Sequence, residues 1–187
     1  MAAKRPMLHK QLGMTSFVLA PALVIVGFLL IPTMRLQMAD AILHGPPAVA
    51  ARLKPAFEFT LNIMLVQIRI GFVFAVMIAV GLWRRRRDSA LHKRLMILGT
   101  AAALPPATDR MLWLPSTLPD NPLTVDLWPL ALLAPMFFWD VYRFGKVHKA
   151  YLLYLGVSLA LAVPMHLLWN TPRWRETALW ILGISGI

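Results

Sequence analysis

The sequence predicts an all-α protein: a polytopic transmembrane bundle of five to six helices with its N-terminus in the cytoplasm. Hydrophobic residues make up 59% of the 187 residues and charged residues only 14%, against about 25% charged residues in a soluble domain. The mean hydropathy is +0.65. Long apolar runs follow one another along the chain, and basic residues gather in alternate connections between them, which is typical of a multi-pass membrane protein.

Five apolar runs are long enough to be membrane helices. The first, residues 11–34, has no charged side chain and is much longer than the apolar region of about 7–15 residues in a cleavable signal peptide. We therefore expect it to be retained. A connection at 36–55 with a turn at 45–47 precedes the second run. The predicted helices are about 12–34, 57–83, 93–114, 123–142 and 149–169, followed by a short apolar tail at 176–187.

The chain contains no linker that would divide it, so we expect a single domain over 1–187. The tail is shorter than the roughly 17 residues that a spanning helix needs. It is therefore a short sixth crossing, an interfacial helix or a packing element. Pro105 and Pro106 lack backbone donors and predict a bend or a break in the third helix. The chain has no cysteine, which excludes disulfides and thiolate chemistry.

The basic residues predict the orientation. The N-terminal segment and the stretches at 84–94 and 140–149 together hold twelve basic and two acidic residues, whereas the opposite connections hold six of each. Basic connections stay in the cytoplasm, so we expect a bacterial inner (cytoplasmic) membrane protein with an internal N-terminus. The net charge of +11 then reflects contact with the lipid bilayer and does not indicate nucleic acid. Other membrane subunits or a homo-oligomer are open as partners.

Polar residues within the apolar runs are candidates for a binding site. Arg69 interrupts the second run, and a guanidinium in a bilayer costs at least about 2.5 kcal/mol unless it pairs or reaches water. At helical spacing Glu58, Asn62 and Arg69 share one face, with a salt bridge to another helix, such as one to Asp109, as the alternative to a substrate or proton pathway. Asp109 and Arg110 follow the proline break, where a discontinuous helix can form a binding site.

The histidines are candidate haem ligands. His92 and His148 begin the third and fifth predicted helices, and His166 lies five turns after His148 on the same face. A neutral imidazole can ligate haem iron, and ordinary interfacial histidines are the alternative. No metal-binding motif such as His-Glu-x-x-His, no catalytic serine arrangement and no phosphate-binding loop is present. We therefore expect no metal site and no classical catalytic residues.

Several motifs resemble those of a family of small multi-pass bacterial membrane proteins of unknown function. The motifs are Leu91-His92-Lys93-Arg94-Leu95-Met96, Leu104-Pro105-Pro106-Ala107 with Arg110, Asp140, Arg143, Gly145, Val147-His148, and Thr171-Pro172-x-Trp174. This resemblance covers the second half of the chain and implies no known activity. The helices with terminal histidines are also remotely similar to four-helix transmembrane cytochrome b proteins, which implies haem.

The sequence leaves three functions open. The leading expectation is an accessory or structural subunit, or a small carrier, with a polar intramembrane centre at Arg69 and the Asp109–Arg110 break. The alternatives are a bis-histidine haem protein of electron transfer and a membrane enzyme that acts on a lipid or isoprenoid. A cavity that opens laterally onto Arg69 is the structural sign expected of the enzyme.

Overall fold

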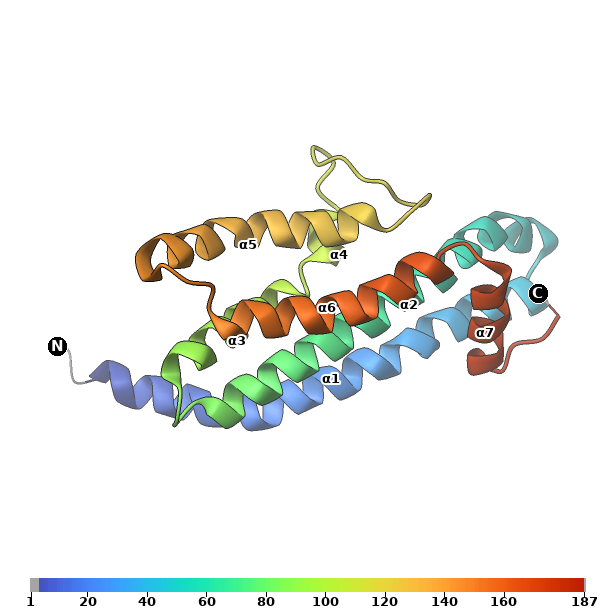
Figure 1. The fold of residues 1–187 in the computed structure, drawn as a ribbon. Coiled ribbons are helices and arrows are strands. Elements are labelled where there is room, and N and C mark those ends of the chain that lie inside the picture. The colour runs from blue at the N-terminus through green and yellow to red at the C-terminus, as the bar shows by residue number, and fades with distance from the viewer. Residues whose placement is uncertain (1–3, 187) are drawn as a thin grey trace.

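The computed structural model describes residues 4–186, with side chains from residue 13 on, and over that range it is all-helical (Figure 1). Residues 1–3 and 187, at the ends of the domain predicted over 1–187, lie outside the described residues. The helices are α1 (Lys4–His44), α2 (Pro47–Arg84), α3 (Ser89–Ala101), α4 (Pro105–Thr108), α5 (Leu123–Phe144), α6 (Lys149–Leu168) and α7 (Pro172–Leu182). Of the helices in the described range, α1, α2, α5 and α6 are long and apolar enough to cross a membrane.

Helices α1 and α2 form a long antiparallel hairpin (Figure 1). The connection predicted over 36–55 is helical except at Gly45 and Pro46. Pro46 is extended, with φ −59° and ψ 144°, and Pro47 begins α2 at the position where a missing N–H costs nothing. The turn residues were therefore assigned correctly, but the apolar stretches around them continue as helix. At 41 and 38 residues, both helices are longer than a bilayer core requires.

The third predicted helix, 93–114, is not continuous. The Asp88 side chain accepts a hydrogen bond from Leu91 N at 2.9 Å and caps α3, which ends at Ala101. The proline pair then begins the four-residue α4, and the chain reaches α5 through turns. Because α3 has only 13 residues, it is not among the four membrane-length helices. Gly99 allows close packing on α2, since a Cβ there would lie 3.0 Å from Met77 Cβ.

The C-terminal helices begin and end at recognisable capping residues. Gly145, at φ +66°, ends α5, and this left-handed conformation suits glycine. His148 caps α6. Thr171 accepts a hydrogen bond from Trp174 N at 3.2 Å and caps α7, which therefore begins before the predicted tail at 176. In Figure 1 α7 lies across the end of the α1–α2 hairpin, at the end of the molecule where the C-terminus lies.

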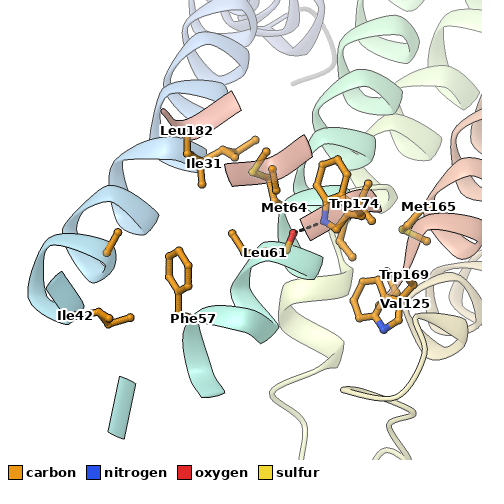
Figure 2. Close-up of a cluster of buried hydrophobic side chains, with 14 residues drawn as sticks. Ile31, Ile42, Phe57, Leu61, Met64, Val125, Met165, Trp169, Trp174 and Leu182 are labelled. Carbon is orange, nitrogen blue, oxygen red and sulfur yellow. Dashed lines mark hydrogen bonds between the residues drawn. The ribbon is translucent and has the colours of Figure 1, made fainter. Parts of the chain in front are cut away.

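Two clusters of buried apolar side chains meet along α2. The first joins the first half of α2 to α1 and α7, with Phe57, Met64 and Trp174 at its centre (Figure 2). The second joins the second half of α2 to α3, α5 and α6, through residues such as Met77 and Leu95. Both clusters use α2, the first up to residue 66 and the second from residue 73. Arg69 therefore lies where the two clusters adjoin.

Candidate functional site

Three ionisable side chains from three helices meet at Arg69. Arg69 is near the middle of α2, Asp126 is in the first turn of α5 and His166 is in the last turn of α6. Arg69 Nη2 forms an ion pair with Asp126 Oδ1. Asp126 Oδ2 lies 2.8 Å from His166 Nε2. The carboxylate of Asp126 thus joins the guanidinium of Arg69 to the imidazole of His166, and we call these residues the Arg69–Asp126–His166 cluster.

The cluster lines a cavity of about 380 Å³ between α2, α5 and α6, beside the end of α3. This volume lies within the range of about 300–1,000 Å³ that is usual for pockets holding small molecules. Besides the cluster, only Tyr154 and Ser158 bring polar side chains to the wall described here. The remaining lining is apolar: Ile70, Val73, Ala102, Pro105, Val125, Pro129, Leu130, Leu155, Leu159, Ala162, Val163 and Leu167.

The cavity opens along the side of the bundle. Leu159, Val163 and Leu167 line it from α6, yet 58%, 55% and 72% of their surfaces are exposed. Helix α6 is one of the helices long enough to span a membrane. In a bilayer such exposed apolar residues face lipid tails. The cavity is therefore accessible from the side on which lipid would lie.

Burial makes the pairing of these charges necessary. The side chains of Arg69 and Asp126 are only 13% and 17% exposed, and an unpaired charge at such a position is strongly unfavourable. The pairing leaves Arg69 Nε buried and without a hydrogen-bond partner among residues 4–186. Asp126, paired with a cation, is an acceptor only. A neutral His166 must then carry its hydrogen on Nε2, which leaves the lone pair of Nδ1 available.

The predicted face of α2 is divided between two sites. Glu58 accepts hydrogen bonds from Arg175 Nε and Nη2 at 2.9–3.0 Å. Asn62 Nδ2 donates to Asn170 Oδ1 at 2.6 Å, and Asn62 Oδ1 accepts from Asn170 N at 3.0 Å. These contacts hold α7 and the turn that precedes it, beside a separate cavity of about 240 Å³. Only Arg69, of the three predicted residues, belongs to the cluster.

Asp109 and Arg110 lie outside the cluster. Both are exposed, and Asp109 Oδ1 accepts a hydrogen bond from Ser116 Oγ at 3.2 Å. Arg110 donates to the carbonyl oxygen of Pro106, one turn earlier. The partner of Arg69 is Asp126 and not Asp109. The proline break still contributes to the wall of the cavity, because Pro105 lines it.

The predicted haem ligands do not come together as a group of three. His166 belongs to the cluster, whereas His92 Nδ1 lies 2.9 Å from the carbonyl oxygen of Gly81. His148 Nδ1 accepts a hydrogen bond from Ala150 N at 3.2 Å. Burial, followed by the positive charge of Arg94, lowers the pKa of His148. No group of three or more His, Asp or Glu side chains in the described part of the chain could hold a metal ion, and haem binding stays a prediction.

A second charged cluster fastens the opposite end of α6. Arg94 donates to Asp140 from Nε at 2.5 Å and from Nη2 at 2.8 Å, and Tyr151 Oη donates to Asp140 Oδ2 at 2.6 Å. Lys149 Nζ lies 2.6 Å from Asp88 Oδ2, and this contact, with the cap to Leu91, lowers the pKa of Asp88. The cluster connects α3, α5 and α6 and is structural.

The sequence did not identify two of the buried polar residues. Asp126 falls inside the predicted helix 123–142, and that position was an available signal. Arg35 directly follows the first uncharged run, yet it is only 3% exposed. Arg35 donates to Thr60 O at 2.6 and 2.9 Å, to Ile31 O at 2.6 Å and to Gln67 Oε1 at 2.8 Å. Its guanidinium thus connects α1 to α2 through neutral acceptors.

Comparisons of the chain with protein-family models, with curated proteins and with solved structures found no match.

Proposed function

We propose that the chain is an integral protein of the cytoplasmic membrane that binds a lipid-soluble molecule in the cavity beside Arg69, as a small carrier or binding protein. The observation that carries this proposal is the cavity itself. It combines a largely apolar wall, a lateral opening and a single group of charges. Pockets of this kind, with few polar groups in an apolar lining, are typical of small-molecule sites.

The orientation proposed is N-terminus inside, with five passages through the membrane. The four helices of membrane length, α1, α2, α5 and α6, support four of these passages. The fifth is α3 and α4 with the following segment, which leads from the end of the molecule where α2 ends toward the end where α5 begins (Figure 1). In the same view, the N-terminus and the basic α2–α3 and α5–α6 connections lie at one end. Such a distribution of basic residues supports a cytoplasmic location for that end.

Single introduced cysteines test the orientation. The chain has no cysteine of its own, so all thiol labelling comes from the introduced residue. Ser89 lies in the basic α2–α3 region and Thr177 in α7, and both are exposed. A maleimide that cannot cross membranes should label Thr177→Cys in intact cells and Ser89→Cys only after lysis. The reverse pattern contradicts the proposed orientation.

Lipid analysis tests the binding function. The purified protein is extracted with organic solvent, and its lipids are compared with those of the source membrane. We expect one molecular class to be enriched with wild type and lost with Val163→Trp, which fills the cavity. Leu152→Trp is the matched control, because Leu152 is also exposed on α6 (61%) but does not line the cavity. Equal lipid content in all three proteins contradicts the proposal and favours an accessory or structural subunit, for which a stable partner should co-purify.

Two observations favour the alternative of a membrane enzyme acting on a lipid or isoprenoid. The first is the lateral opening of the cavity beside Arg69, which is the structural sign expected of such an enzyme. The second is the contact between Asp126 and His166, which resembles the arrangement in which a carboxylate orients a general base. Ser158 is eight residues from His166, about 12 Å along α6, so His166 cannot activate it as a nucleophile. An enzyme here would be limited to proton transfer. Chemical change of the bound lipid by wild type, abolished in His166→Asn with binding retained, supports this alternative.

A further inference from the structure

We propose that the cavity takes a single-chain amphiphile with a monoanionic headgroup, a long-chain carboxylate, and that its binding is coupled to protonation of His166. This inference rests on the proposed function of lipid binding. The hydrocarbon chain of the ligand lies in the cavity against the apolar residues of α5 and α6. The headgroup lies at the Arg69–Asp126–His166 cluster.

The charge of the cluster selects a monoanion. Arg69 contributes one positive charge and Asp126 one negative charge, so the cluster is neutral when His166 is neutral and carries one positive charge when His166 is protonated. The side chains of Arg69 and Asp126 are largely buried and that of His166 is 36% exposed, and a group of charges removed from water in this way is most favourable when it is balanced. One carboxylate balances the protonated cluster, whereas a phosphate dianion leaves an excess negative charge. The balance therefore favours a carboxylate over a phosphate monoester.

The hydrogen-bonding capacity of the cluster also points to an acceptor. Arg69 Nε is buried without a partner among the described residues, and an unsatisfied buried donor costs about 1–3 kcal/mol. A carboxylate oxygen would satisfy it and would use the charge of the guanidinium as well. The unsatisfied donor therefore favours a ligand with an anionic or strongly accepting headgroup over a plain hydrocarbon.

The shape of the cavity favours one chain. At about 380 Å³ it holds the volume of roughly a dozen water molecules, which is small for a two-chain lipid. The exposed lining residues Leu159, Val163 and Leu167 mark where a longer chain would leave the cavity and enter the surrounding lipid. The headgroup can thus be buried while the remainder of the chain stays in the bilayer.

The proton needed for this balance is supplied by a ligand that arrives as the acid, or is taken up from the aqueous phase together with a ligand that arrives as the anion. A carboxylic acid arriving from the bilayer breaks its O–H bond, His166 Nδ1 forms the N–H bond, and the carboxylate remains beside Arg69. The transfer forms an ion pair and leaves the net charge of the cavity unchanged. The charged groups that face His166 are Asp126 from α5 and, through it, Arg69 from α2. Asp126 stabilises the imidazolium that results.

Photolabelling of the purified protein in phosphatidylcholine nanodiscs tests the headgroup. The probe is a palmitic acid analogue with a diazirine on its chain, and the matched probe is its methyl ester. We expect the acid to label peptides of α5 and α6 about tenfold more than the ester, because a hydrogen bond to a charged group contributes at least that factor. This preference should vanish in Arg69→Gln and persist in Arg69→Lys and in Arg52→Gln, an exposed arginine of α2 outside the cavity.

A long-chain alkyl sulfonate tests the proton coupling, because its headgroup stays anionic throughout the measurement. Its binding to wild type should strengthen as the pH falls, because protonation of His166 supplies the positive charge that balances the headgroup, and should not change in His166→Asn. A pH-independent affinity in wild type overturns the coupling. Equal labelling by acid and ester overturns the headgroup assignment while the lipid-binding function stands. Absence of cavity labelling by both probes contradicts the proposed function as well.

Discussion

Arg94 and Asp140, which lie 46 residues apart in the sequence, form a two-point ion pair between α3 and α5, with N···O distances of 2.5 and 2.8 Å. Both side chains are largely buried, at 14% and 11% exposure. A guanidinium bound through two nitrogens fixes the orientation of its partner as well as its distance. Because Asp140 also accepts from Tyr151, this pair determines how α3, α5 and α6 meet.

We predict that Arg94→Gln lowers the free energy of unfolding by about 3 kcal/mol, because it leaves the buried carboxylate of Asp140 without its cation. Thermal or denaturant unfolding in detergent measures the change. Arg143→Gln is the control: Arg143 is exposed and lies one turn from Asp140, and its loss should cost less than about 0.5 kcal/mol. If both variants lose the same stability, the pair does not fasten the helices.

Removing both charges of the Arg69–Asp126 pair should be less harmful than removing one. We predict that Arg69→Leu and Asp126→Leu each destabilise the protein by at least about 2 kcal/mol, since each leaves a buried charge unpaired. The double variant should be more stable than either single variant. A double-mutant cycle of unfolding free energies measures this coupling, and additive losses contradict a direct pair.

Arg35 should not be replaceable by lysine. Its guanidinium reaches Thr60, Ile31 and Gln67 together, whereas an ammonium group is a single point charge with a different geometry. We predict that Arg35→Lys lowers the unfolding free energy by about 1–3 kcal/mol. Arg52→Lys, at an exposed position, provides the comparison and should leave the stability unchanged. Equal stability of the two variants would mean that the several donors of the Arg35 guanidinium are not required.

The stability of the α5–α6 connection should depend on pH through His148. Burial holds the pKa of His148 below its ordinary value of 6.5, so the unfolded chain takes up a proton more readily than the folded protein. The contribution is therefore fully present above pH 6.5 and is lost as the pH falls toward the folded pKa. His148→Asn keeps an acceptor for the cap and removes the titration. Between about pH 7.5 and about pH 5.5, on either side of the ordinary value, the melting temperature of wild type should fall more than that of the variant.

The attachment of α7 should depend on one tryptophan. Trp174 Nε1 donates to Leu61 O at 2.8 Å (Figure 2), and the side chain is 6% exposed. Trp174→Phe keeps an aromatic ring but loses this bond, at an expected cost of about 1 kcal/mol. Trp180→Phe, at a residue that is 81% exposed, should have no effect. Proteolysis of the C-terminal segment and unfolding in detergent measure the two variants, and equal protection of both contradicts this attachment.

Apolar run length predicted α1, α2, α5 and α6, four of the five expected membrane helices, because a helix in lipid pairs its backbone polar groups internally. It predicted their limits less well. The segment 36–55 carries charges and turn residues, which suggested a connection, but its apolar residues pack against α2 and α7 and extend both long helices. Residues 93–114 are apolar throughout much of their length, but the break predicted at Pro105 and Pro106 is confirmed, since α3 ends at Ala101 and α4 begins at Pro105.

The candidate site shows the same limit. Sequence reasoning identified Arg69, since a lone guanidinium in an apolar run is conspicuous, but it could not identify the partner. Asp126 and His166 lie on different helices, and their approach to Arg69 depends on how α5 and α6 rotate when they pack. Spacing along one helix suggested Glu58 and Asn62 as companions. Those residues instead bind Arg175 and Asn170, because α7 folds back over that part of α2.

The shared use of α2 by both apolar clusters has a consequence for biogenesis. The α1–α2 hairpin is synthesised first, and its two helices lie side by side (Figure 1), so it can insert and pair before the rest of the chain is made. The part of α2 that later packs against α5 and α6, including Arg69, then remains in contact with lipid until those helices have been translated. During that interval the guanidinium has no carboxylate from α5, and the growing chain depends on snorkelling or on the insertion machinery to shield it.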